Sequence, residues 1–289
     1  MQDFRHPSEF ITFLMIGAQK AGTTWIDEVL RRHPDIFLPE KKEVHFFDFP
    51  ENLAKGVQYY SSHFEGMATE SHAGECTPDY LWTVGTEFEQ SHPHDVFGTA
   101  KRTYNVLPDI RLVVSLRNPV DRAISAFHHH RARGRFPLDK GPKDVWYEWG
   151  IVSSGWYARQ LEEWYQYYDP SRFLILFFEE DIKPDGIKRA TIDRICRHIG
   201  TTPLPDSVNL DFRANDRLNP AMAYLNKVPL LRDRYRGQIL AQQIDKMLPP
   251  QIQSMLEYEV KASDIEFLQE EFQPHNAALE ALLGRKLPW

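Results

Sequence analysis

The sequence predicts an α/β fold in which a central parallel sheet is flanked by helices on both faces, in three layers. Three short apolar runs support this prediction: residues 11–16, 111–116 and 173–178. Each run is continuously hydrophobic, as is typical of strands that are buried on both faces. A helical pattern follows each run, and this alternation favours parallel strands joined by right-handed crossovers.

The first two strand–helix pairs have clear boundary signals. The first run passes through a glycine-containing turn into a predicted helix over residues 23–33. The second run leads into a predicted helix over residues 119–133. Asn118 is a favoured N-cap for this helix, and Pro119 suits its first position.

The third run is followed by a predicted helix over residues 187–200, where Gly200 suits a helix end. Another helix is predicted before this run, over residues 156–168, and residues 249–283 are predicted to be mostly helical. Three long segments rich in turn residues are candidate functional loops: residues 39–74, 134–155 and 203–229.

The composition is that of a globular protein and disfavours several classes of protein. No internal repeat or linker divides the 289 residues, so we expect a single domain over residues 1–289. The net charge of −7 argues against nucleic acid as a partner, because nucleic-acid binding needs a basic surface. Cys76 and Cys196 have no metal-ligand spacing, so neither a metal site nor a disulfide framework is expected. Without a signal peptide or an apolar span of about 20 residues, a cytoplasmic location is expected.

Positive charge is nevertheless concentrated between Lys101 and Arg135. This stretch includes three consecutive histidines, 128–130, and few acidic residues. Such clustering usually marks a solvated helix face, but it also suits an anion site.

The segment GAQKAGTTW, residues 17–25, is similar to a phosphate-binding loop with an unusual lysine position. A glycine-containing turn that opens a helix directs backbone amides and the positive helix end toward an anion. A nucleoside triphosphatase places its lysine directly after the second glycine, whereas here Lys20 lies inside the loop. The next predicted strand ends in Arg117 instead of a carboxylate that would help to hold magnesium. The loop therefore suits an anion that needs no bridging metal.

A second motif, RNPVDRAISAF, covers residues 117–127. On the predicted helix Asn118, Arg122 and Ser125 share one face, at spacings of four and three. A phosphate group would be well bound there by arginine and a serine hydroxyl. The alternative is that Arg122 is solvated and Ser125 is a small packing residue.

Together the two motifs resemble the sulfotransferase superfamily, whose members use 3′-phosphoadenosine-5′-phosphosulfate (PAPS). The resemblance extends through EKKEVHFFD (40–48) and GECTPDYL (74–81), which are similar to the branch of heparan sulfate N- and 3-O-sulfotransferases and bacterial enzymes. The closing segment FQPHNAALEALLGRKLPW matches more loosely. The resemblance implies a P-loop-like fold and no metal.

The resemblance also implies roles for individual residues. Arg117 and Ser125 would bind the 3′-phosphate, and Arg213 or Arg217 in a late loop would close over the cofactor. Lys20 would stabilise the bridging oxygen that leaves with adenosine 3′,5′-bisphosphate (PAP). The first loop would hold the 5′-phosphosulfate through Gly17, Gln19, Lys20, Ala21, Gly22, Thr23, Thr24 and Trp25.

The catalytic base is predicted in the segment KKEVHFF. An extended segment would place Glu43, His45 and Phe47 on one face, whereas a helix would separate Glu43 from His45. A buried glutamate beside phenylalanines would have a raised pKa, while the adjacent lysines would lower it. The resemblance implies Glu43 as the base, with His45 as the alternative, and Lys42 as a residue that orients the sulfuryl group.

Aromatic residues between positions 146 and 168 have two interpretations. The residues at helical spacing are predicted to pack in the core: Trp156, Gln160, Trp164 and Tyr168. Trp146, Tyr147 and Trp149 fall in a predicted loop and would form an apolar wall for the acceptor or a lid. The resemblance implies that residues 74–81 line the cleft.

The sequence thus predicts a metal-independent sulfotransferase that acts on a hydroxyl, less readily an amine. The acceptor would be a small molecule, a glycan, a lipid or a carrier-bound intermediate. One alternative is a P-loop kinase for a small molecule, whose activity with ATP would require magnesium. Another is a nucleotide-binding module without catalysis. No prediction of the oligomeric state follows from the sequence.

Overall fold

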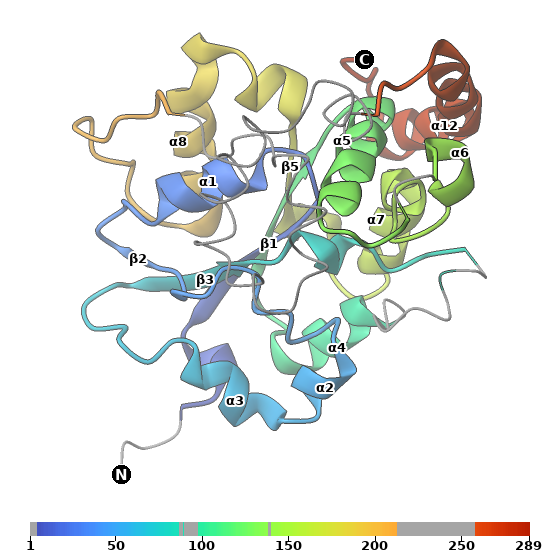
Figure 1. Cartoon of the computed structure of the whole chain (residues 1–289). Coiled ribbons are helices and arrows are strands. Elements are labelled where there is room, and N and C mark those ends of the chain that lie inside the picture. The colour runs from blue at the N-terminus through green and yellow to red at the C-terminus, as the bar shows by residue number, and fades with distance from the viewer. Residues whose placement is uncertain (1–4, 87–88, 90–97, 138–139, 213–257) are drawn as a thin grey trace, which may run out of the picture.

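A computed structural model describes residues 5–86, 89, 98–137, 140–212 and 258–289. Its centre is a sheet of five parallel strands in the order β2-β3-β1-β4-β5 (Figure 1). The strands are β1 (Ile11–Gly17), β2 (Ile36–Phe37), β3 (His72–Cys76), β4 (Arg111–Leu116) and β5 (Phe173–Phe177). The three predicted strands are β1, β4 and β5, so the predicted α/β fold with a central parallel sheet is confirmed.

Nine α-helices are present in the part of the chain that the structure describes. They are α1 (Thr23–Leu30), α2 (Pro50–Leu53), α3 (Gly56–Ser62), α4 (Thr99–Val106), α5 (Pro119–Ala132), α6 (Pro142–Val145), α7 (Tyr157–Tyr165), α8 (Lys188–Ile199) and α12 (Ala262–Leu283). The predicted helices correspond to α1, α5, α7, α8 and α12; the first four are shorter than predicted, and residues 249–257 of the last prediction lie outside the described residues. Strand β2 and helix α4 were not predicted, and the long predicted loops contain α2, α3 and α6.

Helices cover both faces of the sheet because side chains of the central strand alternate between them. Leu14 and Ile16 of β1 pack in the same core as Trp164 of α7. Phe13 and Met15 pack on the opposite face, with the apolar side chains of α1 and α8. Figure 1 shows α1 and α8 on one side of the sheet and α5, α7 and α12 on the other. Each fully buried large apolar side chain contributes about 1.5–3 kcal/mol to stability.

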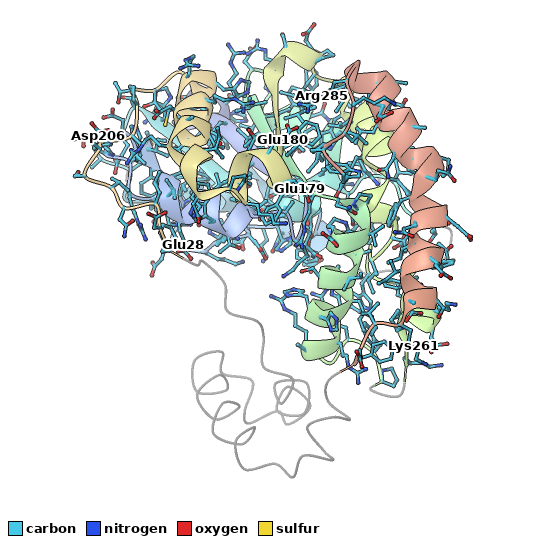
Figure 2. The ribbon with its side chains drawn as sticks, turned by 90° about the horizontal axis from the view of Figure 1, so that it is seen from above. Glu28, Glu179, Glu180, Asp206, Lys261 and Arg285 are labelled. Atoms are coloured by element: carbon cyan, nitrogen blue, oxygen red, sulfur yellow. The ribbon has the colours of Figure 1, made fainter. Side chains whose placement is uncertain are left out.

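The segment after α12 packs against the end of β5. The Arg285 guanidinium donates to both carboxylate oxygens of Glu180, at 2.8 and 3.1 Å. Figure 2 shows these two residues at the same end of the molecule. The Trp289 ring lies 5.7 Å from that of Phe177 and 6.4 Å from that of Tyr157, centre to centre. Because Tyr157 donates to the carbonyl of Arg117 at 2.8 Å, the closing segment supports the end of β4.

The sheet brings the ends of β1 and β4 together. The amide of Ala18, just after β1, donates to the carbonyl of Ser115 in β4 at 2.7 Å. Ligands of such parallel sheets bind beyond the carboxyl ends of the strands. The two sequence motifs, which follow β1 and β4, therefore meet at this edge.

Close packing of β3 against β1 gives a stability test. A Cβ atom at Gly74 would lie 2.6 Å from the Phe13 ring and from the Phe13 carbonyl oxygen. We expect Gly74→Ala to lower the free energy of unfolding by about 1–3 kcal/mol, because the paired backbone cannot move aside. Urea denaturation measures the change. Gly186→Ala is the control, since a Cβ there meets no atom within 4 Å. Equal stability of the two variants would contradict the expected clash.

Candidate active site

The loop between β1 and α1 has the backbone of an anion-binding site. Gly22 adopts a left-handed conformation, with φ of 84°, as the N-cap of α1. A Cβ at Gly22 would also lie 3.0–3.2 Å from Ile182 and Phe178. Both the left-handed backbone and this close packing therefore favour glycine. Among the described residues, no protein acceptor takes a hydrogen bond from the amides of Gly22, Thr23 and Thr24. These amides at the positive end of a helix are available to an anion.

Two residues bind carbonyl groups of this loop: one in β4 and one at the start of the second motif. The Ser115 hydroxyl donates to the carbonyl of Ala21 at 2.6 Å. The Arg117 guanidinium donates to the carbonyl of Lys20 at 3.1 Å. The two motifs recognised in the sequence thus contact each other directly.

Lys20 lies within a group of cations. Its backbone is left-handed, with φ of 69°. Burial lowers the pKa of Lys20 to about 8, together with the charges of Arg133 and Arg117. Glu43 opposes this shift without cancelling it. A bound anion would relieve the repulsion among these cations, so the residues fit an anionic ligand.

Arg117 and the start of α5 form the second part of the site. The Arg117 Nε atom is buried and has no hydrogen-bond partner among the residues that the structure describes. Its guanidinium lies 4.9 Å from the centre of the Phe178 ring. Asn118 caps α5, because its side chain accepts from the amides of Val120 and Asp121 at 2.9 and 3.4 Å, as predicted. Ser125 follows on the same helix and is half-buried.

Arg122 corrects one interpretation of the second motif. It was expected either to bind phosphate or to be solvated, but its side chain is fully buried. Its guanidinium donates to the carbonyls of Gly150 and Ile151. Arg122 therefore anchors the loop before α7.

Glu43, His45 and Lys42 converge beside Lys20. The Lys42 ammonium donates to the Thr24 hydroxyl at 2.9 Å and lies 3.7 Å from a Glu43 carboxylate oxygen. The second Glu43 oxygen lies 3.8 Å from His45 Nε2. At this distance the two groups form an ion pair but not a hydrogen bond. His45 Nδ1 is 2.7 Å from a carboxylate oxygen of Asp48.

The backbone that presents these groups is neither extended nor helical. Glu43 and His45 both have positive φ, 61° and 55°. Neither alternative considered from the sequence therefore applies, and the Phe47 ring is fully buried in the core. Two left-handed residues are what bring the side chains of Glu43 and His45 together.

The charges in this cluster follow from its contacts. Burial raises the pKa of Glu43, but contact with His45 and the charge of Lys42 outweigh it and lower that pKa to about 2. Burial lowers the pKa of His45, but its hydrogen bond to Asp48 and its contact with Glu43 raise it to about 10. At neutral pH the pair is carboxylate and imidazolium. Only Glu43 has a basic site for a proton, and the raised pKa considered for it from its phenylalanine neighbours is not observed.

Other predicted residues take different places. The Gln19 amide donates to an Asp79 carboxylate oxygen at 3.1 Å. The indole of Trp25 is buried and donates to the carbonyl of Leu210 at 3.2 Å, so its side chain belongs to the core. Trp146 is also a core residue, which removes it from the proposed apolar wall. Arg213 and Arg217 lie outside the described residues.

The sequence assigned no individual role to three residues near the site: His129, Arg133 and Arg135. Burial lowers the pKa of His129 to about 2, together with the charges of Lys20 and Arg133. The Arg135 guanidinium lies 4.4 Å from the centre of a Trp149 ring. The concentration of positive charge up to Arg135 was the signal for these residues. These residues belong to α5 and the loop after it, and they come close to Lys20 and Glu43 only in the folded chain.

Residues 11–213 match the sulfotransferase domain family. The chain belongs to the sulfotransferase family. The heparan sulfate glucosamine 3-O-sulfotransferase 6 of Mus musculus is 31% identical over 201 residues, which are 63% of this chain and 54% of that protein. The membrane-associated sulfotransferase kil1 of Dictyostelium discoideum is 34% identical over 119 residues, 40% of this chain and 22% of that protein. This sulfotransferase chain thus spans about half or less of these two relatives.

A solved sulfotransferase structure from Alicyclobacillus acidocaldarius has the same architecture. It is 26% identical in sequence, with a TM-score of 0.63, and the match covers 96% of this chain and 97% of that one. Within the described part of this sulfotransferase, the helices are too short or too polar to cross a bilayer.

The ionisation of His45 can be measured directly. We expect its pKa to fall from about 10 toward the ordinary 6.5 in Asp48→Asn, because the carboxylate that favours the imidazolium is removed. The raised pKa stabilises the wild-type fold fully below pH 6.5, and this contribution disappears as the pH rises through 10. Imidazole NMR titration gives the pKa, with Asp109→Asn on the surface as the control. An unchanged His45 pKa in Asp48→Asn would contradict this assignment.

Proposed function

We propose that this chain transfers a sulfuryl group from PAPS to an acceptor hydroxyl. The observation that carries the proposal is the position of ionised Glu43 beside Lys20, at the edge of a loop whose amides and cations suit an anion. PAPS, when bound, supplies the sulfuryl group. That group is joined to the 5′-phosphate through an oxygen that leaves with PAP. The membership of residues 11–213 in the sulfotransferase family supports the same reaction.

The two motifs would divide the binding of the nucleotide. The amides of the loop, with the hydroxyls of Thr23 and Thr24, would hold the 5′-phosphosulfate. Arg117 and Ser125 would hold the 3′-phosphate, and the buried Nε atom of Arg117 offers a donor for it. Lys42, which contacts Thr24 in this structure, would contribute a further positive charge near the sulfuryl group.

Lys20 would act on the leaving group. As the sulfur–oxygen bond breaks, negative charge develops on the bridging oxygen, and an ammonium group fixed nearby stabilises it. Burial and the neighbouring cations lower the pKa of Lys20 to about 8, and a bound anion would raise it again. Lys20 would therefore be positively charged when the nucleotide is in place.

Glu43 would accept the proton of the acceptor hydroxyl as its oxygen bonds to sulfur. With a pKa of about 2 it is a weak base, so it would orient the hydroxyl first and take the proton late in the reaction. His45, held as an imidazolium by Asp48, would keep the Glu43 carboxylate in place and is not the base.

The acceptor proposal rests on charge and on relatives. Arg133 and Arg135 act electrostatically on Glu43 and His129, so the space beside the base is positive. A hydroxyl on an acidic glycan suits this field better than one on a neutral lipid. The mouse relative is named for a glycan acceptor, heparan sulfate glucosamine.

Substitutions of the two reacting residues test the chemistry. We expect Glu43→Gln and Lys20→Ala each to reduce sulfate transfer by about 10² or more, because each removes a group that acts in the transition state. Transfer of radiolabelled sulfate from PAPS to a panel of glycans, alcohols and lipids measures the rate. Chelator should leave transfer unchanged, whereas chelator-sensitive turnover of ATP would favour the kinase. A near-normal rate in Glu43→Gln would return the base assignment to His45.

Nucleotide binding is tested separately. We expect Arg117→Ala to weaken PAP binding at least tenfold, because a charge-assisted contact to phosphate is worth about 1.5–3 kcal/mol. Isothermal titration calorimetry measures the affinity. Arg172→Ala is the control, since that arginine pairs with the exposed Asp109 at 3.2 Å. Absence of any binding heat from PAP with the wild-type protein would exclude the proposed function.

A further inference from the structure

A buried carboxyl group lies behind the base and takes no part in the proposed reaction. Glu75 in β3 is 1% exposed. Its Oε1 atom accepts hydrogen bonds from the hydroxyls of Tyr60 and Tyr80, at 2.8 and 3.0 Å. Its Oε2 atom accepts from the Thr77 hydroxyl at 2.8 Å. All three partners donate, so the arrangement is satisfied by an acceptor-only carboxylate.

Tyr80 connects this carboxylate to the segment of the base. Its hydroxyl has a single hydrogen, which it donates to Glu75. The same oxygen accepts the backbone amide of Phe46 at 2.8 Å. Glu75 therefore fixes the direction in which the Tyr80 hydroxyl points and leaves its lone pair to Phe46. Phe46 directly follows His45.

The segment from Glu43 to Asp48 needs such support, because Glu43 and His45 both have left-handed backbones that L-residues rarely adopt. Other side chains bind its carbonyls: the Asn52 amide donates to His45 at 2.9 Å. The Arg102 guanidinium donates to the carbonyl of Phe47 at 2.7 Å. Tyr80 supplies the acceptor for the amide between these two carbonyls.

We propose that Glu75 and Tyr80 are positioning residues for sulfuryl transfer. Glu75 orients the Tyr80 hydroxyl, the hydroxyl holds the Phe46 amide, and this hydrogen bond keeps Glu43 and His45 in their left-handed conformations. The inference rests on the proposed function, because it takes Glu43 as the base. It also changes the interpretation of residues 74–81, since Tyr80 is fully buried and supports the site from behind.

Tyr60 provides a matched control for Tyr80. Both hydroxyls donate to the same oxygen of Glu75, and both rings pack on Phe47, at 5.1 and 5.4 Å between centres. Phenylalanine at either position keeps the ring and removes one hydrogen bond to the carboxylate. Only Tyr80→Phe also leaves the Phe46 amide buried without its acceptor.

The first measurement is the rate of transfer. We expect Tyr80→Phe to lower kcat about 10- to 100-fold, because a small displacement of a catalytic group is enough for a loss of this size. The affinity for PAP should stay within about twofold, since the hydrogen bonds of the Tyr80 hydroxyl are to Phe46 and Glu75 and not to the loop after β1. Tyr60→Phe should keep kcat near that of the wild type. Glu75→Gln should lower kcat less than Tyr80→Phe, because its amide oxygen can still accept from Tyr80 while its NH₂ group donates to the Thr77 hydroxyl.

The second measurement needs no turnover. Amide hydrogen exchange of the free protein reports the hydrogen bond of Phe46 itself. Exchange at Phe46 should be faster in Tyr80→Phe than in Tyr60→Phe, and by more than the difference in global stability that urea denaturation gives for the two variants.

The outcomes separate the two proposals. Wild-type kcat and wild-type exchange in Tyr80→Phe would overturn the positioning role, as would equal losses of kcat in the two tyrosine variants. If the wild-type protein transfers no sulfate, the proposed function fails instead. The exchange comparison would still show whether Tyr80 holds the Phe46 amide.

Discussion

The site depends on how the carbonyl groups of the loop after β1 are bound. Ser115 and Arg117, both from β4 and its end, donate to the carbonyls of Ala21 and Lys20. Because these acceptors are satisfied on the side of the sheet, the amides at the start of α1 are left for a ligand. Ser115 and Arg117 thus determine that a loop nearly a hundred residues earlier in the chain presents its amides, and not its carbonyls, to a ligand. A phosphate-binding loop recognised only by its glycines would miss this dependence.

Burial is the largest influence on the pKa of Lys20, Glu43 and His45, but its outcome differs among them. Glu43 and His45 each contact a group of opposite charge, and those contacts outweigh desolvation. Lys20 has one carboxylate against several cations, so desolvation and repulsion act in the same direction. The Glu43–His45 pair is therefore balanced in charge. In the loop, the positive charge of Lys20 and its neighbouring cations is not balanced. This difference locates the place for an anion at Lys20.

Much of this arrangement was predictable from local patterns. Apolar runs identified β1, β4 and β5, and Asn118 with Pro119 identified the start of α5. The conformations of Glu43 and His45 were not predictable, because left-handed residues other than glycine have no local signature and depend on contacts such as that of Tyr80. The burial of Arg122 and Trp146 was missed for a related reason: their partners lie in other segments of the chain.

The distance between Lys20 and the Glu43 segment depends on the pairing of β1 with β3. Lys20 follows β1, whereas the Glu43 segment is tied through Tyr80 to the end of β3. The Thr77 amide donates to the carbonyl of Met15 at 3.1 Å, which extends the pairing of these strands toward the site. Gln19 adds a direct bond to Asp79 across the same gap.

The loop after β1 and the Glu43 segment are thus tied to neighbouring, hydrogen-bonded strands. Arg135, whose charge acts on Glu43, and the Trp149 ring beside it come from the segment between α5 and α7 instead. Changes in the segment between α5 and α7 would therefore leave Lys20 and Glu43 in place, because the two parts of the candidate site are held by different elements.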